Sequence, residues 1–207
     1  MIAQSSPSDN RTLLSFIERE TPPMSSSVRN AFLMSIFSLS LLLSAALMFS
    51  VQPMVGKMLL PVVGGTPAGW IVAMAFFQLA LLAGYAAAYA MTRLSAPLHG
   101  IAYVAFLALG FLLLPIGIST TGLNETPGAG GTFLLLATSI GLPFMALATT
   151  ATTLQRLFAA TPHPAAGDPY FLYAASNLGS FAGLLLYPLL IEPALPLGLQ
   201  NTGWQIF

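Results

Sequence analysis

The sequence predicts an all-α protein, a polytopic bundle of transmembrane helices. Of its 207 residues, 56% are hydrophobic and only 6% are charged, whereas a soluble domain carries about 25% charged residues. Six Lys/Arg and six Asp/Glu residues are too few to coat a surface that faces water. These charges fall almost entirely between long apolar runs, as the cost of burying a charge in lipid requires. The composition therefore predicts a surface that faces the lipid bilayer.

Several classes of function are excluded by composition. The formal net charge of zero argues against nucleic acid and against strongly charged soluble partners. The absence of cysteine excludes disulfides, thiolate metal sites and cysteine nucleophiles. The sequence shows no phosphate-binding glycine loop, no metal-ligand cluster and no Ser/His/Asp set. We therefore expect no catalytic residues, no metal site and no cofactor.

The first element is a polar head, residues 1–30, which is rich in serine and proline. Within it Leu13, Leu14, Phe16 and Ile17 lie at near-helical spacing between charges. This pattern predicts either a short amphipathic helix on the membrane surface or a mostly disordered tail with one apolar patch.

Five apolar runs follow the head. A helix needs about 20 residues to cross a ~30 Å hydrocarbon core, and each run reaches that length. The breaks between them are rich in glycine and proline. The chain ends on Trp204, Ile206 and Phe207, which predicts the start of a sixth span and a chain that is cut short. The five complete spans are expected at about 31–51, 68–91, 98–118, 132–154 and 170–191.

The placement of Lys and Arg predicts the orientation. With the head in the cytoplasm, Arg29, Arg93 and Arg156 fall on the inner side and Lys57 falls outside. The predicted N-terminus is therefore inside. Lys57 and Glu192 both lie at outer ends of spans, and we expect them to pair, for a gain of under about 1 kcal/mol.

The first apolar stretch is longer than a bilayer. Residues 31–63 would form a helix of about 50 Å, so the stretch must tilt, break or leave its end in the interface. Pro53 and Gly56 are natural places for a bend. Gln52 and Lys57 either line a cavity at a broken helix, or Gln52 bonds a neighbouring helix while Lys57 extends to the headgroups.

Small residues mark two helix-contact faces. On the second run Gly84, flanked by Ala80 and Ala88, predicts close packing, with Gln78 and Tyr85 as polar candidates. On the fifth run Gly179 and Gly183 form a G-x-x-x-G pair, with Ser176 and Ser180 one turn apart. Asn177 is the most polar buried candidate, and Tyr173 lies nearby. Packing is the first interpretation of these residues, and contact with a substrate is the second.

The fourth run carries a polar face that leads to the inner surface. Three threonines and Arg156 follow a spacing of three and four residues, and Gln155 lies beside them. Arg156 is expected to contact Asp168 across the following loop. Alternatively, the threonines bond their own backbone or an adjacent helix. The threonines are Thr149, Thr152 and Thr153.

Titratable groups are scarce inside the predicted spans. His99 and His163 lie at loop ends, and no Asp or Glu lies at the centre of a run. A proton-coupled pump would normally need a buried titratable group, and a polyamine or metal channel would need carboxylates. The sequence therefore argues against both.

Several strings together resemble a known family. The longest are FSVQPMVGKMLLP at 49–61 and DPYFLYAASNLGS at 168–180. The set is similar to the N-terminal membrane part of bacterial fused major-facilitator/spermidine-synthase-like proteins, over about residues 31–207. The resemblance implies a half-facilitator bundle of six spans in a bacterial cytoplasmic membrane; the synthase-like domain of that family is not in this sequence. The other strings are 64–68 with Trp70, 76–78 with 82–85, 154–156, 187–188 and 192–193.

Two hypotheses of function remain open. The first is a non-catalytic module that anchors or scaffolds a missing domain or a partner membrane protein. The second is a transporter or binding half-module for a small molecule, with a polyamine-related compound as one candidate, that works with a second membrane half or as a homo-oligomer. An intramembrane enzyme lacks a nucleophile and base that could be paired. Convergence of polar side chains on one cavity would favour the second hypothesis; these are Gln52, Gln78, Gln155 and Asn177.

Overall fold

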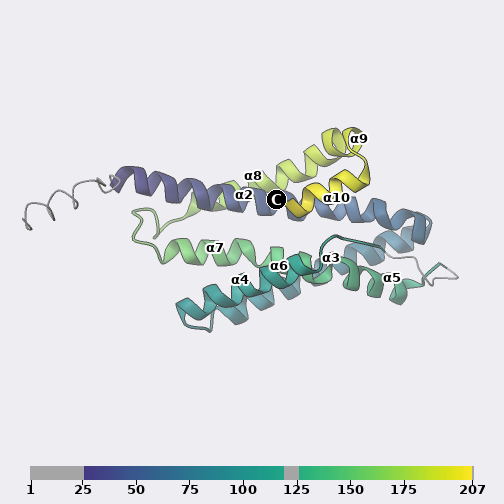
Figure 1. Ribbon diagram of the computed structural model, residues 1–207, viewed down its shortest axis with the longest axis horizontal. Helices are drawn as coiled ribbons and strands as arrows, with labels where there is room; N and C mark the ends of the chain where they lie inside the picture. Colours follow the sequence, from purple (N-terminus) through teal and green to yellow (C-terminus); the bar gives the residue numbers. More distant parts are fainter. Residues whose placement is uncertain (1–25, 119–125, 207) are drawn as a thin grey trace, which may run out of the picture. The chain divides into compact units, whose positions relative to one another are not determined.

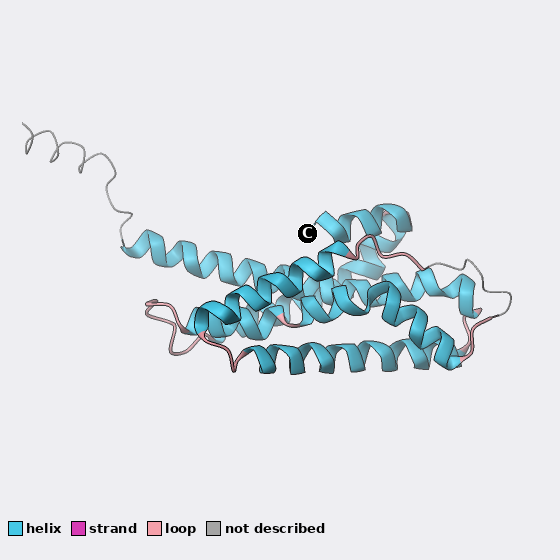
Figure 2. Cartoon of the chain, turned by 60° about the horizontal axis from the view of Figure 1, so that its bottom comes forward, coloured by secondary structure: helices cyan, strands magenta, loops and turns pink. Residues whose placement is uncertain are grey.

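The computed structural model describes residues 26–118 and 126–206. In these residues the chain forms helices joined by loops, with no strand (Figures 1 and 2). The chain divides into two compact units, residues 1–35 and 36–207. Of the first unit only residues 26–35 are described, and they begin the first long helix, which starts at Ser26 inside the predicted head. The other predictions for the head lie outside the described residues.

Among the described residues, four stretches are long and apolar enough to cross a membrane: Ser26–Val63, Pro67–Met91, Ala129–Ala159 and Tyr170–Ala194. This confirms a helical protein with membrane-type helices. The individual elements are α2 (Ser26–Val63), α3 (Pro67–Met91), α4 (Ala96–Leu112), α5 (Ala129–Leu136), η1 (Ala137–Gly141), α6 (Leu142–Ala148), α7 (Thr150–Ala159), α8 (Tyr170–Leu186), η2 (Tyr187–Ile191), α9 (Glu192–Ala194) and α10 (Leu197–Ile206).

Helix α2 is continuous where the sequence suggested a break. It runs through Pro53 and Pro61 over 38 residues, about 57 Å at 1.5 Å per residue, so part of it extends beyond a ~30 Å core. Gly56 serves packing at this position. A Cβ atom on Gly56 would lie 2.9 Å from Cζ3 of Trp70, so the missing side chain makes room for the indole of α3.

The third predicted span is shorter than expected. Helix α4 ends at Leu112 instead of continuing to Ile118, and its 17 residues measure about 26 Å. Pro115 explains the early end, because proline has no N–H to donate and restricts the residue before it. The non-helical segment that follows is still packed, since Ile116 is almost fully buried.

The fourth and fifth spans each contain a π-helical turn. In the fourth, η1 separates α5 from α6, and Thr149 separates α6 from α7. In the fifth, η2 follows α8. Pro143 and Pro188 lie just after and within these turns, and each lacks the N–H that would reach the carbonyl four residues back. The wider turns therefore lie where the regular hydrogen-bond ladder cannot be completed.

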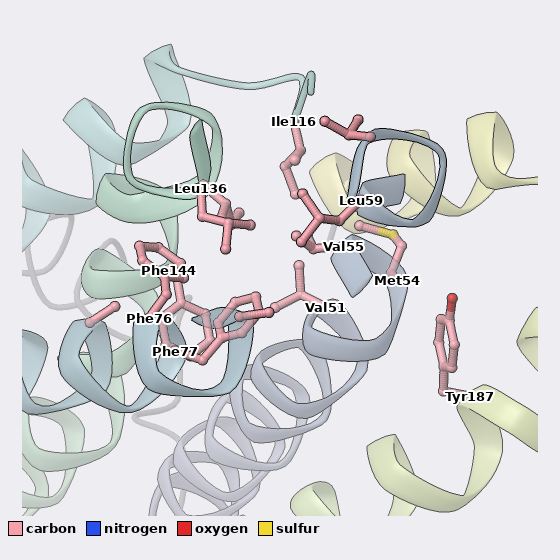
Figure 3. Close-up of a cluster of buried hydrophobic side chains, with 14 residues drawn as sticks. Val51, Met54, Val55, Leu59, Phe76, Phe77, Ile116, Leu136, Phe144 and Tyr187 are labelled. Atoms are coloured by element: carbon pink, nitrogen blue, oxygen red, sulfur yellow. The ribbon is translucent and has the colours of Figure 1, made fainter. Parts of the chain in front are cut away.

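The main core joins α2 and α3 to the fourth span. Figure 3 shows Val51, Val55 and Leu59 on α2 facing Phe76 and Phe77 on α3. Phe77 also makes an edge-to-face contact with Phe144, at 5.1 Å between centroids. The other buried members of the cluster are Met54, Val62, Ala73, Ala80, Ile116, Leu136, Ile140 and Tyr187.

Glycines set the closest helix contacts. A Cβ atom on Gly84 would lie 2.7 Å from Cβ of Ala148, so α3 and α6 approach closely. On α8, a Cβ atom on Gly183 would lie 2.5 Å from the carbonyl oxygen of Ala46, and Gly179 faces the backbone of Leu42. The G-x-x-x-G pair thus presses α8 against α2 within the same chain.

The expected start of a sixth span is a packed helix, α10. The Nε1–H of Trp204 donates to the carbonyl of Leu47 on α2 at 3.1 Å. The amide of Asn201 donates to the carbonyl of Ile116 at 2.7 Å. These bonds use backbone carbonyls as acceptors and hold α10 against the rest of the second unit.

Candidate functional site

The structure contains a polar cavity of about 230 Å³ between α2, α3, the α6–α7 segment and α8. It brings together two residues that the sequence singled out, Tyr85 and Asn177. Ser44 contributes from α2, and Ser176 and Ser180 contribute from α8. The remaining lining residues are Ala45, Met48, Phe49, Leu81, Leu147, Ala148 and Ala151.

The local packing of the helices explains why this space stays open. Gly84 holds α3 against α6, and Tyr85 is the next residue on α3. Gly179 and Gly183 hold α8 against α2. The cavity lies between these two close helix pairs, and the small side chains of Ala148 and Ala151 leave room on the fourth span.

The polar atoms of the cavity fall into two groups. The hydroxyls of Ser44 and Ser180 donate to carbonyls of their own helices, at 3.1 and 3.0 Å. The side chains of Tyr85, Ser176 and Asn177 make no hydrogen bond to any described residue. These three side chains are therefore available to a bound molecule.

The chemistry that this lining supports is binding. A tyrosine hydroxyl, a serine hydroxyl and a carboxamide all both donate and accept hydrogen bonds without carrying charge. Among the described residues that line the cavity there is no histidine, lysine, arginine or carboxylate. General acid–base or nucleophilic catalysis needs an activated group of that kind, so the cavity has no basis for it. In the described chain, no group of three or more His, Cys, Asp or Glu residues could hold a metal ion.

The three predicted glutamines do not join the cavity. Gln52 and Gln155 are half-buried elsewhere, and Gln78 is exposed on α3. None of the three side chains forms a hydrogen bond with the residues described. The four polar residues proposed to converge therefore do not, and the glutamine side chains make no hydrogen bond between the described helices either.

Lys57 and Glu192 form the ion pair that the sequence predicted. Lys57 Nζ lies 3.1 Å from Glu192 Oε1, and both side chains are about 40% exposed, at 39% and 41%. Such exposure limits the pair to under about 1 kcal/mol. The pair joins the end of α2 to α9, and Lys57 does not line the polar cavity.

The predicted contact between Arg156 and Asp168 is wrong. The described residues contain no ion pair between them, and both are exposed. Water at the membrane surface solvates both charges, so neither needs the other. Tyr173 is also exposed, with its ring 6.4 Å from that of Tyr170, and does not line the cavity.

The threonines of the fourth span largely follow the backbone-bonding alternative. Thr149 donates to the carbonyl of Ala146 at 2.7 Å, and Thr152 donates to that of Thr149 at 3.1 Å. Thr153 differs, since its hydroxyl is buried without a partner in the described structure.

Sequence reasoning did not connect four buried polar residues of α4 and α7, here called the closed polar cluster: His99, Tyr103, Thr150 and Thr153. The Tyr103 hydroxyl donates to Thr150 Oγ1 at 3.2 Å, which joins α4 to α7. His99 is only 2% exposed, and its Nδ1 lies 3.0 Å from the carbonyl of Met91. Its Nε2 is buried without a partner among the described residues.

The bond between Tyr103 and Thr150 joins α4 to α7, and the two helices run in opposite directions (Figure 1). His99 was assigned to a loop end from sequence. The available signal was spacing, because His99 and Tyr103 are four residues apart and Thr150 and Thr153 are three apart.

Comparisons of the chain with protein-family models, with curated proteins and with solved structures found no match. Its function is therefore inferred from its own residues.

Proposed function

We propose that the chain is a non-catalytic membrane module that anchors or scaffolds a partner membrane protein. The observation that carries this proposal is Gln78. It lies halfway along α3, a helix long enough to span a bilayer, and its side chain is exposed without a hydrogen bond to the residues described. An amide that faces hydrocarbon without a partner is costly. A second protein that covers Gln78 removes this cost.

The surroundings of Gln78 form a continuous contact face, here called the α3 stripe. Its members recur every three or four residues and therefore share one side of the helix. The other five members are each at least 42% exposed, and Gln78 is exposed as well. A regular apolar stripe with one central amide suits a neighbouring helix that carries a polar group at the same depth. The stripe comprises Ile71, Met74, Gln78, Leu82, Tyr85 and Tyr89.

The orientation of the chain, its membrane and its number of spans belong to the same proposal. We place the N-terminus inside a bacterial cytoplasmic membrane, with α4 as a short fifth span and α10 as the start of a sixth, in a half-facilitator bundle. Support comes from two arginines. Arg93 follows α3, and Arg156 lies in the last turn of α7. These ends lie away from α9 (Figure 1). At α9, Glu192 pairs with Lys57 and neutralises its charge. The same proposal includes the resemblance to the membrane part of synthase-like fused proteins.

Photo-crosslinking in the native membrane tests the proposal. A photoreactive residue replaces Met74, which is 60% exposed on the α3 stripe, and a matched control replaces Ile101, which is 64% exposed on α4. We expect a protein adduct of one defined mass from position 74 and none from position 101. Gln78→Leu should lower the yield at position 74 by about threefold to thirtyfold, the effect of losing one interhelical amide bond.

Lipid adducts alone from both positions would contradict the proposal. An unchanged yield in Gln78→Leu would also contradict it, because the central amide would then play no part in the contact.

A further inference from the structure

We infer that the polar cavity is a binding site for a small uncharged molecule that both donates and accepts hydrogen bonds. This inference goes beyond the proposed scaffold role and does not depend on it. The α3 stripe concerns a protein partner on one face of α3, whereas the cavity lies between four helical segments of the same chain, and Tyr85 is the residue that the two share.

The first argument is hydrogen-bonding capacity. The Tyr85 hydroxyl, the Ser176 hydroxyl and the Asn177 amide all line the cavity and make no bond to the described residues. Together they offer both donors and acceptors from two helices. Ser176 is half-buried and Tyr85 and Asn177 are exposed, but all three lie on helices long and apolar enough to span a membrane, where a polar group without a partner is costly. Three available groups around one space therefore indicate that the partner comes from outside the chain.

The second argument is charge. The lining side chains in the described structure carry no ionisable group other than the Tyr85 phenol. A charged molecule in this space would lose its hydration without gaining an opposite charge, which is unfavourable. The cavity therefore disfavours polyamines and carboxylates, and favours amides, ureas and polyols.

The third argument is size. The cavity holds about 230 Å³, below the roughly 300–1,000 Å³ of pockets that accept drug-sized ligands. One water molecule occupies about 30 Å³ of liquid. The space thus suits a compact solute, and its hydroxyl and amide groups can replace the hydrogen bonds that such a solute makes with water.

The test uses pairs of probes that differ in charge but hardly in shape. The chain is labelled with ¹⁵N-asparagine and reconstituted in lipid nanodiscs, and the side-chain amide signals are followed by NMR. Propionamide is compared with propionate, and glycerol with putrescine. The Asn177 signal is assigned by its loss in Asn177→Leu. Asn201 is the internal control, because its amide already donates to Ile116.

We expect the Asn177 signal to shift saturably with at least one of the two neutral probes and not with its charged counterpart, while Asn201 stays unchanged. Ser176→Ala, a small change that keeps the helix, should weaken that binding by about threefold to tenfold, the effect of one hydrogen bond. Gln155→Leu, outside the cavity, should leave it unchanged.

Three outcomes would overturn the inference: no saturable shift with either neutral probe, equal shifts with charged and neutral probes, or equal binding in Ser176→Ala. These outcomes leave the scaffold proposal untouched, because photo-crosslinking at Met74 does not depend on the cavity.

Discussion

The fourth span separates two polar regions that differ in accessibility. On one side Leu147, Ala148 and Ala151 line the polar cavity, where three polar side chains have no partner among the described residues. On the other side Thr150 and Thr153 belong to the closed polar cluster, where each residue is at most 8% exposed. Hydroxyl-bearing side chains therefore lie in an open environment on one side of the fourth span and in a closed environment on the other side.

The difference arises from how closely the neighbouring helices approach. On the closed side, Gly110 lets α4 approach α6, since a Cβ atom there would lie 3.0 Å from Cβ of Ala146. On the cavity side, Gly179 and Gly183 direct α8 onto α2. The position of the glycines, more than the number of polar residues, thus determines which polar region is open.

The largest expected effect comes from replacing Gly179 with alanine. Its Cβ would meet the backbone of Leu42, and overpacking of this kind costs about 1–3 kcal/mol or more. We expect α8 to separate from α2, which would destroy the cavity and leave the closed cluster intact. Unfolding in a titration with SDS measures the loss. The control is Gly100→Ala in α4, where nothing lies within 4 Å and the change should stabilise the helix slightly.

Equal stability of Gly179→Ala and Gly100→Ala would contradict this account of the α2–α8 contact.

The next largest effect compares the same substitution on the two sides. Tyr103→Phe removes the hydroxyl that donates to Thr150 and leaves a buried oxygen without a partner, which costs about 1–3 kcal/mol. Tyr85→Phe removes a hydroxyl that has no partner among the described residues, so the change should stay within about 0.5 kcal/mol. Both are measured by the same titration with SDS.

The double variant Tyr103→Phe/Thr150→Val separates hydrogen bonding from packing. Because it removes both partners, it should recover part of the stability lost in Tyr103→Phe. If Tyr85→Phe cost as much as Tyr103→Phe, the two regions would not differ in the way described here.

Hydropathy was enough to predict the helical membrane fold, because lipid requires apolar surfaces and internally bonded backbones. It did not predict where helices end. Pro115 shortens α4, whereas Pro53 lies inside the continuous helix α2. A proline interrupts a helix only where neighbouring groups fail to satisfy the freed carbonyl, and that depends on packing that one sequence does not reveal.

The candidate site was predicted only in part for a similar reason. Tyr85 and Asn177 line the cavity, whereas Gln78 faces outward. Each was recognised as polar, but the direction of a side chain depends on how its helix is rotated against its neighbours. His99 shows the same limit, because its burial depends on the carbonyl of Met91 and on packing around the start of α4.

The smallest expected effect changes no stability and concerns the tautomers of the two histidines. A carbonyl can only accept, so the contact between His99 Nδ1 and Met91 requires a proton on Nδ1. His163 Nδ1 instead accepts the backbone N–H of Ala165 at 3.0 Å, so its neutral ring must carry the proton on Nε2. ¹⁵N-histidine NMR in alkaline buffer, where imidazoles are neutral, distinguishes the two forms, and His163→Gln assigns the signals. A proton on Nε2 of His99 would mean that His99 does not make the bond to Met91, and a proton on Nδ1 of His163 would mean that His163 does not accept from Ala165.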